Sequence, residues 1–300
     1  MNKLIPLPAA ITQYVHDGDI VYAAGFTHLI PFAAGHEIIR LRRRDLVLAR
    51  ATPDLIYDQM VAAGCARKVI FSYMGNPGVG SLRVVRAELE AGRLEWEEYS
   101  HFGMISRLQA GAAGLPFMPM NQTAATDLER LNPNISRVTD PYSGGEVIVV
   151  PALNPDVAIV HVQRADRDGN AQLWGILGEQ KEAAFAAKRV VLTAEEIVDE
   201  AVIRSDPNRT VIPGFIVSAV CHVPYACHPS YAQGYYDRDN EFYLKWDTIS
   251  TSMENVKSWL DEWVYGVESR EEYWKKLGAA VHDRLKVEPR MSAAINYGQY

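Results

Sequence analysis

The first ninety residues alternate short apolar segments with segments of helical periodicity. The apolar segments are rich in β-branched residues and end in turn signals, as buried strands do. Gly92 then follows the last helical segment of the series at the position that favours glycine. Apolar strands that alternate with helices are typical of an open, mainly parallel α/β sheet with helices on both faces. We expect strands at 20–24, 46–49 and 68–73, and helices at 8–15, 32–43, 55–63 and 82–91.

The second half of the chain continues this pattern less regularly. Residues 121–145 are polar, with Asn-Pro, Asp-Pro and Ser-Gly-Gly steps, and are predicted to form a long loop. After Asp237 the composition shifts, because four of the six tryptophans lie there among charged residues. We therefore expect a single domain over residues 1–300 with a C-terminal helical extension at about 237–290. Strands are predicted at 147–151, 157–163, 189–193 and 215–223, a hairpin arm at 171–174, and helices at 104–113, 179–187, 253–264 and 270–285.

The charge balance limits the partners that this chain can have. It carries 30 basic and 37 acidic residues, a net charge of −7, which argues against nucleic acid or an anionic membrane as the main partner. The basic run from Arg40 to Arg44 is interpreted as a solvated helix end, with a phosphate site as the alternative. We find no bilayer-spanning stretch and no signal-peptide core. We therefore expect a cytoplasmic protein.

Two glycine-containing loops are the strongest candidates for a binding site. Gly25 to Thr27 ends the first predicted strand, and Gly75 to Gly80 joins a strand to a helix. Ligands bind α/β sheets at such strand ends, and free backbone N–H groups there suit an anion or a developing oxyanion. Neither loop matches the dinucleotide-binding or phosphate-loop motifs, so neither NAD nor ATP is supported. An ordinary strand-to-helix turn remains the alternative.

His101 is the one histidine with neighbours that suggest chemistry. It follows Glu97 and Glu98, and a histidine near carboxylates can act as a general base. The alternative is a residue at a helix start that is hydrogen-bonded to its neighbours. Two histidines follow cysteines directly and are treated below. The remaining histidines show no pattern of neighbours that suggests a partner; these are His16, His28, His36, His161 and His282.

A metal site and two hydrolytic sites are not supported. The sequence Cys221-His222 and Cys227-His228 offers zinc ligands, but adjacent residues on a strand point to opposite faces, so we predict no metal. The chain has no Gly-x-Ser-x-Gly motif. Adjacent carboxylates at 195–196 would diverge on a strand, which disfavours a concerted acid/base pair. The residues alone thus predict an enzyme-like α/β domain without a convincing nucleophile.

Several long segments resemble the α subunits of glutaconate CoA-transferase, in the same order and nearly from end to end. The opening segment is similar to that family's helix, Gly-Asp turn and Gly-Gly-Phe strand end, with Ala24 in place of the first glycine. The matching segments are ITQYVHDGDIVYAAGF (11–26), PDVAIVHVQRADRDGNAQLWG (155–175), AAKRVVLTAEEIVD (186–199) and IPGFIVSAVCHVPYACHPSYAQGYYDRDN (212–240).

The resemblance implies the fold and covalent chemistry of family I CoA transferases. In these enzymes a glutamate attacks an acyl-CoA, which divides one difficult exchange into easier steps. In heteromeric members that glutamate lies in the β subunit, and the α subunit completes the site. The resemblance therefore implies no catalytic nucleophile in this chain and no permanently bound cofactor. It also implies a CoA thioester and a carboxylic acid as substrates, and a β-type partner in an α2β2 or larger assembly.

The family's binding loops map onto named positions of this sequence. One departure is Pro77, where glutaconate-specific members carry a serine; proline has neither a hydroxyl nor a backbone N–H, which disfavours glutaconate itself. The substrate-binding residues implied by the resemblance are Gly25, Phe26, Thr27, Asn76, Pro77, Gly78 and Val79.

Relatives with other chemistry define the alternatives. Some proteins on the same heteromeric fold hydrolyse a ring in a CoA thioester, and others decarboxylate an acyl-CoA. The ring-hydrolysing relatives place an acidic residue near the position of His101, so an acyl-CoA hydrolase or decarboxylase is the alternative function. A non-catalytic scaffold protein is a third hypothesis, which the glycine loops disfavour because a scaffold needs no close approach of its backbone to a ligand.

Overall fold

A parallel seven-stranded sheet forms the centre of the protein. The computed structural model describes residues 2–76, 79–120 and 126–287. Strand β8 pairs with both β1 and β10 through residues 157–159, so it lies between them, and the order is β12-β10-β8-β1-β2-β3-β4. The parallel strands are β1 (Ile20–Ala23), β2 (Leu46–Ala49), β3 (Ala66–Phe71), β4 (Glu95–Glu98), β8 (Val157–Ala165), β10 (Arg189–Ile197) and β12 (Ala219–His222).

Side chains on successive strand residues enter two separate cores. Leu46 and Leu48 of β2 join one hydrophobic cluster, and Val47 and Ala49 join the other, as the alternation of a strand requires. The expectation of an open, mainly parallel sheet with helices on both faces is confirmed. One face is covered by α1 (Leu7–Tyr14), α2 (Phe32–Arg40), α3 (Leu55–Ala62), α4 (Arg83–Glu90), α9 (Asn240–Ile249) and α10 (Met253–Leu260), and the other by α5 (His101–Ala112) and α7 (Gln180–Ala186).

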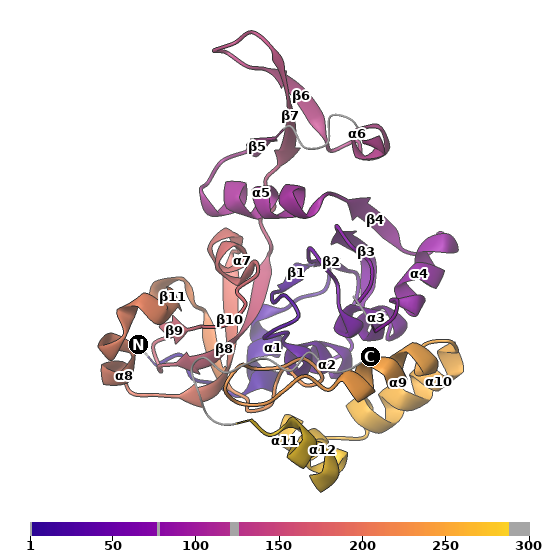
Figure 1. Cartoon of the computed structure of the whole chain (residues 1–300), viewed down its shortest axis with the longest axis vertical. Helices are drawn as coiled ribbons and strands as arrows, with labels where there is room; N and C mark the ends of the chain where they lie inside the picture. The colour runs from indigo at the N-terminus through magenta and orange to yellow at the C-terminus, as the bar shows by residue number, and fades with distance from the viewer. Residues whose placement is uncertain (1, 77–78, 121–125, 288–300) are drawn as a thin grey trace.

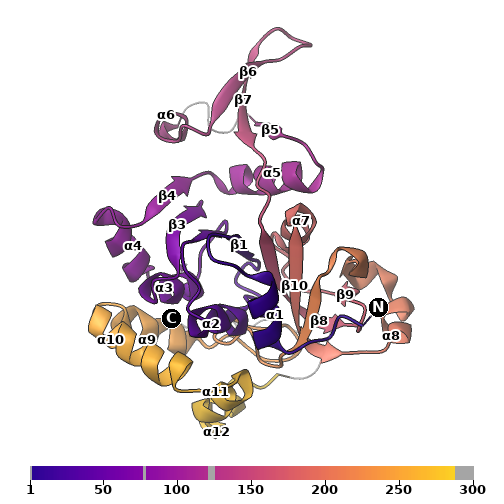
Figure 2. The ribbon, with the colours of Figure 1, turned by 180° about the vertical axis from the view of Figure 1, so that it is seen from behind.

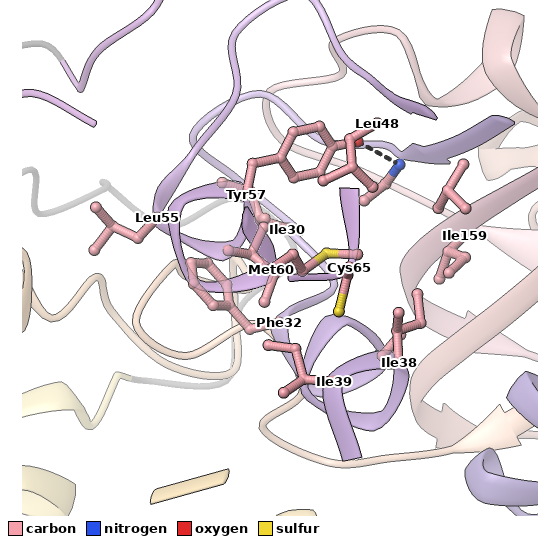
Figure 3. Packing of buried hydrophobic residues seen from close by; sticks show 14 of the residues in the cluster. Ile30, Phe32, Ile38, Ile39, Leu48, Leu55, Tyr57, Met60, Cys65 and Ile159 are labelled. Carbon is pink, nitrogen blue, oxygen red and sulfur yellow. Dashed lines mark hydrogen bonds between the residues drawn. The ribbon is translucent and has the colours of Figure 1, made fainter. Parts of the chain in front are cut away.

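The first core fixes the ends of the central strands (Figure 3). Tyr57 of α3 donates a hydrogen bond to the carbonyl of Ala49 (2.8 Å), and its hydroxyl accepts one from the amide of Ala23 (3.2 Å). Helices α2 and α3 approach closely, since a Cβ at Gly35 would lie 2.3 Å from Ile56. These contacts hold the carboxyl ends of β1 and β2 in place, and the loops that follow both strands start from a rigid base.

A small antiparallel sheet projects from the molecule (Figures 1 and 2). It consists of β5 (Phe117–Met120), β6 (Ser136–Thr139) and β7 (Glu146–Pro151) in the order β5-β7-β6, with α6 (Asp127–Leu131) beside it. The prediction of a continuous loop at 121–145 was therefore wrong for α6 and β6; residues 121–125 lie outside the described residues. The Ser-Arg-Val-Thr sequence of β6 is mostly exposed, so it lacks the apolar alternation by which strands are recognised.

The C-terminal extension contains the expected helices with one interruption. Helix α10 continues into a π-helical turn (Asp261–Tyr265), and the helix predicted at 270–285 is divided into α11 (Arg270–Leu277) and α12 (Ala279–Leu285). Gly278 separates them with a φ of +86°, which glycine tolerates. Residues 288–300 lie outside the described part. No helix in the described ranges combines the length and apolar character needed to cross a membrane.

Several other elements differ from the predictions. Helix α2 ends at Arg40, because Arg42 has a left-handed φ of +54°, and the rest of the basic run lies beyond the helix. The strand predicted at 215–223 is a 3-10 turn (Gly214–Ile216) followed by β12. Strand β4 was not predicted because its sequence, Glu-Trp-Glu-Glu, is charged. The remaining short elements are β9 (Ala171–Gln172), which forms the expected hairpin arm, β11 (Thr210–Ile212), α8 (Glu200–Ser205) and a 3-10 turn at Pro207–Arg209.

Candidate active site

The strand order changes direction between β1 and β8. From β1 the chain adds β2, β3 and β4 in one direction, whereas from β8 it adds β10 and β12 in the other. Adjacent parallel strands whose connections diverge in this way leave a binding crevice at their carboxyl ends. The loop after β1 lies at this position, and the loop after β3 lies at the same edge of the sheet.

The loop after β1 has a strained backbone. Gly25 has a φ of +136°, and a Cβ there would lie 2.8 Å from the carbonyl oxygen of His28. Thr27 and Leu29 both adopt left-handed φ values, +56° and +55°, which residues with a side chain rarely do. Ser230 donates a hydrogen bond to the carbonyl of Thr27 (2.7 Å) and helps to hold this conformation. Such strain is concentrated at functional sites.

The loop after β3 closes on itself. The amide of Asn76 donates to the carbonyl of Gly80 (2.9 Å), and the amide of Val79 donates to the carbonyl of Asn76 (3.1 Å). The side chains of Asn76 and Val79 are buried, so they anchor the loop. Pro77 and Gly78 lie outside the described residues. The binding role of this loop stays a prediction.

His101 lies where three strand ends and a helix start meet. It is the first residue of α5, whose N-cap Ser100 accepts a hydrogen bond from the amide of Gly103 (3.0 Å). Its Nε2 is 2.8 Å from Oγ1 of Thr52, after β2, and its Nδ1 is 3.0 Å from Oγ of Ser72, after β3. The ring of Phe26, from the loop after β1, is edge-on to the imidazole at 6.4 Å.

The hydrogen bonds of His101 define its protonation. Ser72 donates its hydroxyl proton to the carbonyl of Ala51 (2.5 Å), so its oxygen accepts from Nδ1–H of His101. Nε2 then accepts from the hydroxyl of Thr52. Partial burial lowers the pKa of His101 below its ordinary value, and the ring is neutral at pH 7. The site thus presents a neutral imidazole with two hydroxyl groups.

Glu97, one of the two carboxylates that precede His101 in the sequence, is engaged elsewhere. Glu97 accepts hydrogen bonds from Lys68, from Tyr99 (3.0 Å) and from Arg107 (3.4 Å), and these bonds join β4 to β3 and α5. Glu97 is therefore not a partner of His101. His101 begins α5, as the alternative interpretation expects, and its catalytic role stays a prediction. Thr52 and Ser72 were missed, because hydroxyl residues at strand ends carry no signal until the strands are aligned.

A buried network joins the middle of β8 to the second half of β10. His161 bonds to Thr193 through Nδ1 (2.9 Å) and to Glu195 through Nε2 (2.9 Å). Glu195 also accepts from the hydroxyl of Tyr236 (2.7 Å) and from the amide of Tyr225 (2.8 Å). No partner was predicted for His161, since these contacts join segments that are far apart in the sequence.

Cys227 lies beside this network. Its sulfur and the nearest ligand atoms of His161 and Glu195 are all within 4.8 Å of one another. Hydrogen bonds to protein groups already occupy His161 and Glu195, so the set is better suited to packing than to a metal ion. Cys221 and His222 point to opposite sides of β12, one buried and one exposed, as expected for adjacent strand residues.

His28, in the loop after β1, contacts the segments that follow β9 and β12. It is fully buried; its Nδ1 donates to the carbonyl of Ile176 (3.0 Å), and its Nε2 accepts from the amide of Gln233 (3.0 Å). Burial lowers its pKa to about 4, so the ring is neutral. Like His161, it supports the loops and is not exposed to a ligand.

The sequence of the chain is similar to those of known proteins. Residues 7–222 match the family model described as coenzyme A transferase. The A-type subunit of the 3-oxoadipate CoA-transferase of Pseudomonas knackmussii is 50% identical over 92% of this chain and 99% of that protein. The A-type subunit of the glutaconate CoA-transferase of Acidaminococcus fermentans is 35% identical over 99% of this chain and 98% of its own length.

Solved structures show the same fold. The glutaconate coenzyme A-transferase of Acidaminococcus fermentans superposes with a TM-score of 0.91 at 34% identity, over 96% of both chains. The decarboxylase AibA/AibB superposes with a TM-score of 0.75 at 28% identity, over 87% of this chain and all of that chain. The resemblance found in the sequence is confirmed, and the chain belongs to the coenzyme A transferase family.

Proposed function

We propose that this chain is the A-type subunit of a heteromeric transferase that moves CoA between an acyl-CoA thioester and a free carboxylic acid. The observation that carries the proposal is the 50% identity to the A-type subunit of a CoA-transferase over nearly the full length of both chains. The loop geometry supports it, because Phe26 of the strained loop packs edge-on against the ring of His101.

The nucleophile in this proposal is a glutamate of the partner subunit. It attacks the thioester carbonyl and releases CoA thiolate, which returns to the glutamyl carbonyl and frees the first acid. The second acid then attacks the glutamyl thioester, and thiolate takes the new acyl group, which regenerates the glutamate. In this chain Glu179 is buried and Glu97 is bound to three side chains, so neither is available for such an attack.

This chain contributes groups that stabilise charge and bind the acid. Backbone N–H groups of the Gly25–Thr27 loop would donate to the oxyanion that forms when the thioester carbonyl is attacked. We place the acid beside His101, because the Thr52 hydroxyl can turn from the imidazole toward a ligand oxygen. A neutral set of donors and acceptors suits a keto oxygen, and the relative at 50% identity is named for 3-oxoadipate. We propose a 3-oxo acid of this kind as the acceptor.

The proposal includes the other features expected from the sequence. These are a β-type partner in an α2β2 or larger assembly, CoA thioester as substrate without a resident cofactor, and a cytoplasmic location. The alternative is an acyl-CoA hydrolase or decarboxylase, which the structural similarity to a decarboxylase supports.

Transfer assays on the co-purified subunits test the proposal. The complex would be given acetyl-, succinyl- or glutaconyl-CoA as donor, with 3-oxoadipate, glutaconate or acetate as acceptor. We expect new acyl-CoA only when an acceptor is present, with a preference of at least about tenfold for 3-oxoadipate over glutaconate. Consumption of acyl-CoA at a rate independent of any acceptor would instead support hydrolysis or decarboxylation.

A further inference from the structure

A buried arginine lies beneath the strained loop. Arg50 follows β2 and is 1% exposed, and its Nε and Nη2 both donate to the carbonyl oxygen of Gly25, at 3.1 and 2.5 Å. Burying a guanidinium is costly unless strong interactions offset the lost hydration. Here those interactions are directed at one backbone carbonyl of the candidate binding loop.

The bond to Gly25 determines the direction of the next amide. The Gly25–Phe26 peptide is trans, so the N–H of Phe26 points opposite to the carbonyl that Arg50 holds. It is therefore directed away from the buried guanidinium. Gly178 lies on this side of the loop, where a Cβ would come within 3.4 Å of the Phe26 nitrogen and 2.6 Å of its Cβ. A glycine there leaves room beside the amide.

A buried carboxyl group lies close to Arg50. Glu179, at the N-terminus of α7, is 2% exposed; burial raises its pKa above the ordinary value, and the nearby Arg50 offsets part of that rise. Nη1 of Arg50 and Oε1 of Glu179 are buried, and neither has a hydrogen-bond partner among the described residues. Arg50 therefore directs its hydrogen bonds at the carbonyl of Gly25.

We propose that Arg50, with the buried Glu179 close to it, is a positioning residue that aims the Phe26 N–H at the oxyanion of the reacting thioester. The inference rests on the proposed transferase function and adds a residue that never touches the substrate. Fixed donors stabilise developing charge because they need no reorganisation during the reaction, and small displacements of a donor are costly. Arg50 provides that rigidity from beneath the loop.

The chain contains a matched control for this arginine. Arg270, at the start of α11, is 8% exposed; its Nε donates to the carbonyl of Tyr225 (2.8 Å) and its Nη2 to that of His228 (2.6 Å). Its Nη1 is also buried without a partner in the described residues. Like Arg50, Arg270 donates from Nε and Nη2 to backbone carbonyls, but it bonds to two different carbonyls and holds the C-terminal extension.

Steady-state kinetics of the complex with its partner subunit test the proposal. For Arg50→Gln we expect kcat to fall about 100-fold while KM for acyl-CoA changes less than about threefold, because an oxyanion donor acts in the transition state. Arg270→Gln should lower Tm by about as much as Arg50→Gln does. Its kcat should stay within about twofold of the wild-type value. Equal losses of kcat in both variants, or an unchanged kcat in Arg50→Gln, would overturn the positioning role.

Two further measurements keep the test decisive if Arg50→Gln does not fold. Glu179→Gln preserves shape and should lower kcat about tenfold at unchanged KM. In Arg50→Ala, added guanidinium at non-denaturing concentration should restore part of kcat, and it should not affect Arg270→Ala. An unchanged kcat in Glu179→Gln, without rescue of Arg50→Ala, would contradict the inference. Absence of transfer by the wild-type complex would instead refute the proposed function.

Discussion

The carboxyl edge of the sheet has two halves that use the same residue types differently. On the β1–β4 half, His101 is exposed at a helix start, and among the described residues it bonds to the hydroxyls of Thr52 and Ser72. On the β8–β12 half, His161 is fully buried and bonded to Glu195, which has two further donors. His161 lies within β8, whereas His101 begins the helix that follows β4.

The difference lies in what covers each half. The segment after β12 supplies Tyr225 and Tyr236 to the network that joins β8 and β10. On the other half, α5 begins at His101, and the His101 side chain is exposed. Burial and hydrogen bonding therefore make the β8–β12 half a rigid support. The open β1–β4 half is suited to bind a ligand. This contrast leads to three predictions.

The largest effect is expected from removing the carboxylate of the covered half. Glu195→Ala leaves His161, Tyr236 and the Tyr225 amide without their acceptor, and we expect a loss of about 3–5 kcal/mol in the free energy of unfolding. Urea unfolding of the purified chain measures it. A loss below about 1 kcal/mol would mean that the network does not support this half.

The contribution of His28 to stability should depend on pH. His28 has a pKa of about 4 in the folded protein against an ordinary 6.5. Between pH 4 and 6.5 the unfolded chain binds more protons than the folded protein does. The free energy of unfolding therefore rises with pH from about 4 to 6.5, and the contribution of His28 is complete above that range. The contribution is about 3 kcal/mol, from 1.36 kcal/mol per unit.

The variant His28→Gln isolates this contribution. Other groups titrate equally in both proteins, so the difference in unfolding free energy between pH 4.5 and pH 7 should be smaller in the variant by a large part of that amount. Identical pH profiles of the two proteins would show that His28 is not held neutral by the fold.

The smallest change in stability should accompany a large change in activity at the open half. His101→Ala should alter the free energy of unfolding by less than about 1 kcal/mol, because the ring is exposed. In the complex it should lower kcat/KM for the acid about 100-fold, and Thr52→Val about tenfold. A destabilisation as large as that of Glu195→Ala would remove the contrast between the halves.

The sequence predicted the repeating parts of the molecule better than its polar contacts. The apolar strands such as β1 and β2 and the helices between them were found, because burial on both faces leaves a continuous apolar pattern. The charged β4 and the polar β6 were missed, since neither shows that pattern.

The candidate site was only partly visible in the sequence. Gly25 could be recognised from its place at a strand end, and the family from long matching segments. The partners of His101 and His161 could not, because Thr52, Ser72 and Glu195 reach them only when distant strands are aligned. Arg50 did carry a signal: it is a charged residue directly after the apolar run Leu-Val-Leu-Ala.

The central claim is that this chain shapes the site while the partner supplies the nucleophile. Borohydride treatment of the complex after incubation with acyl-CoA tests it, because borohydride reduces a glutamyl-CoA thioester to an alcohol and lowers the mass of the protein chain that carries it. Intact mass spectrometry of each chain should then show a mass loss on the partner and none on the chain described here. A mass loss on this chain would contradict the account.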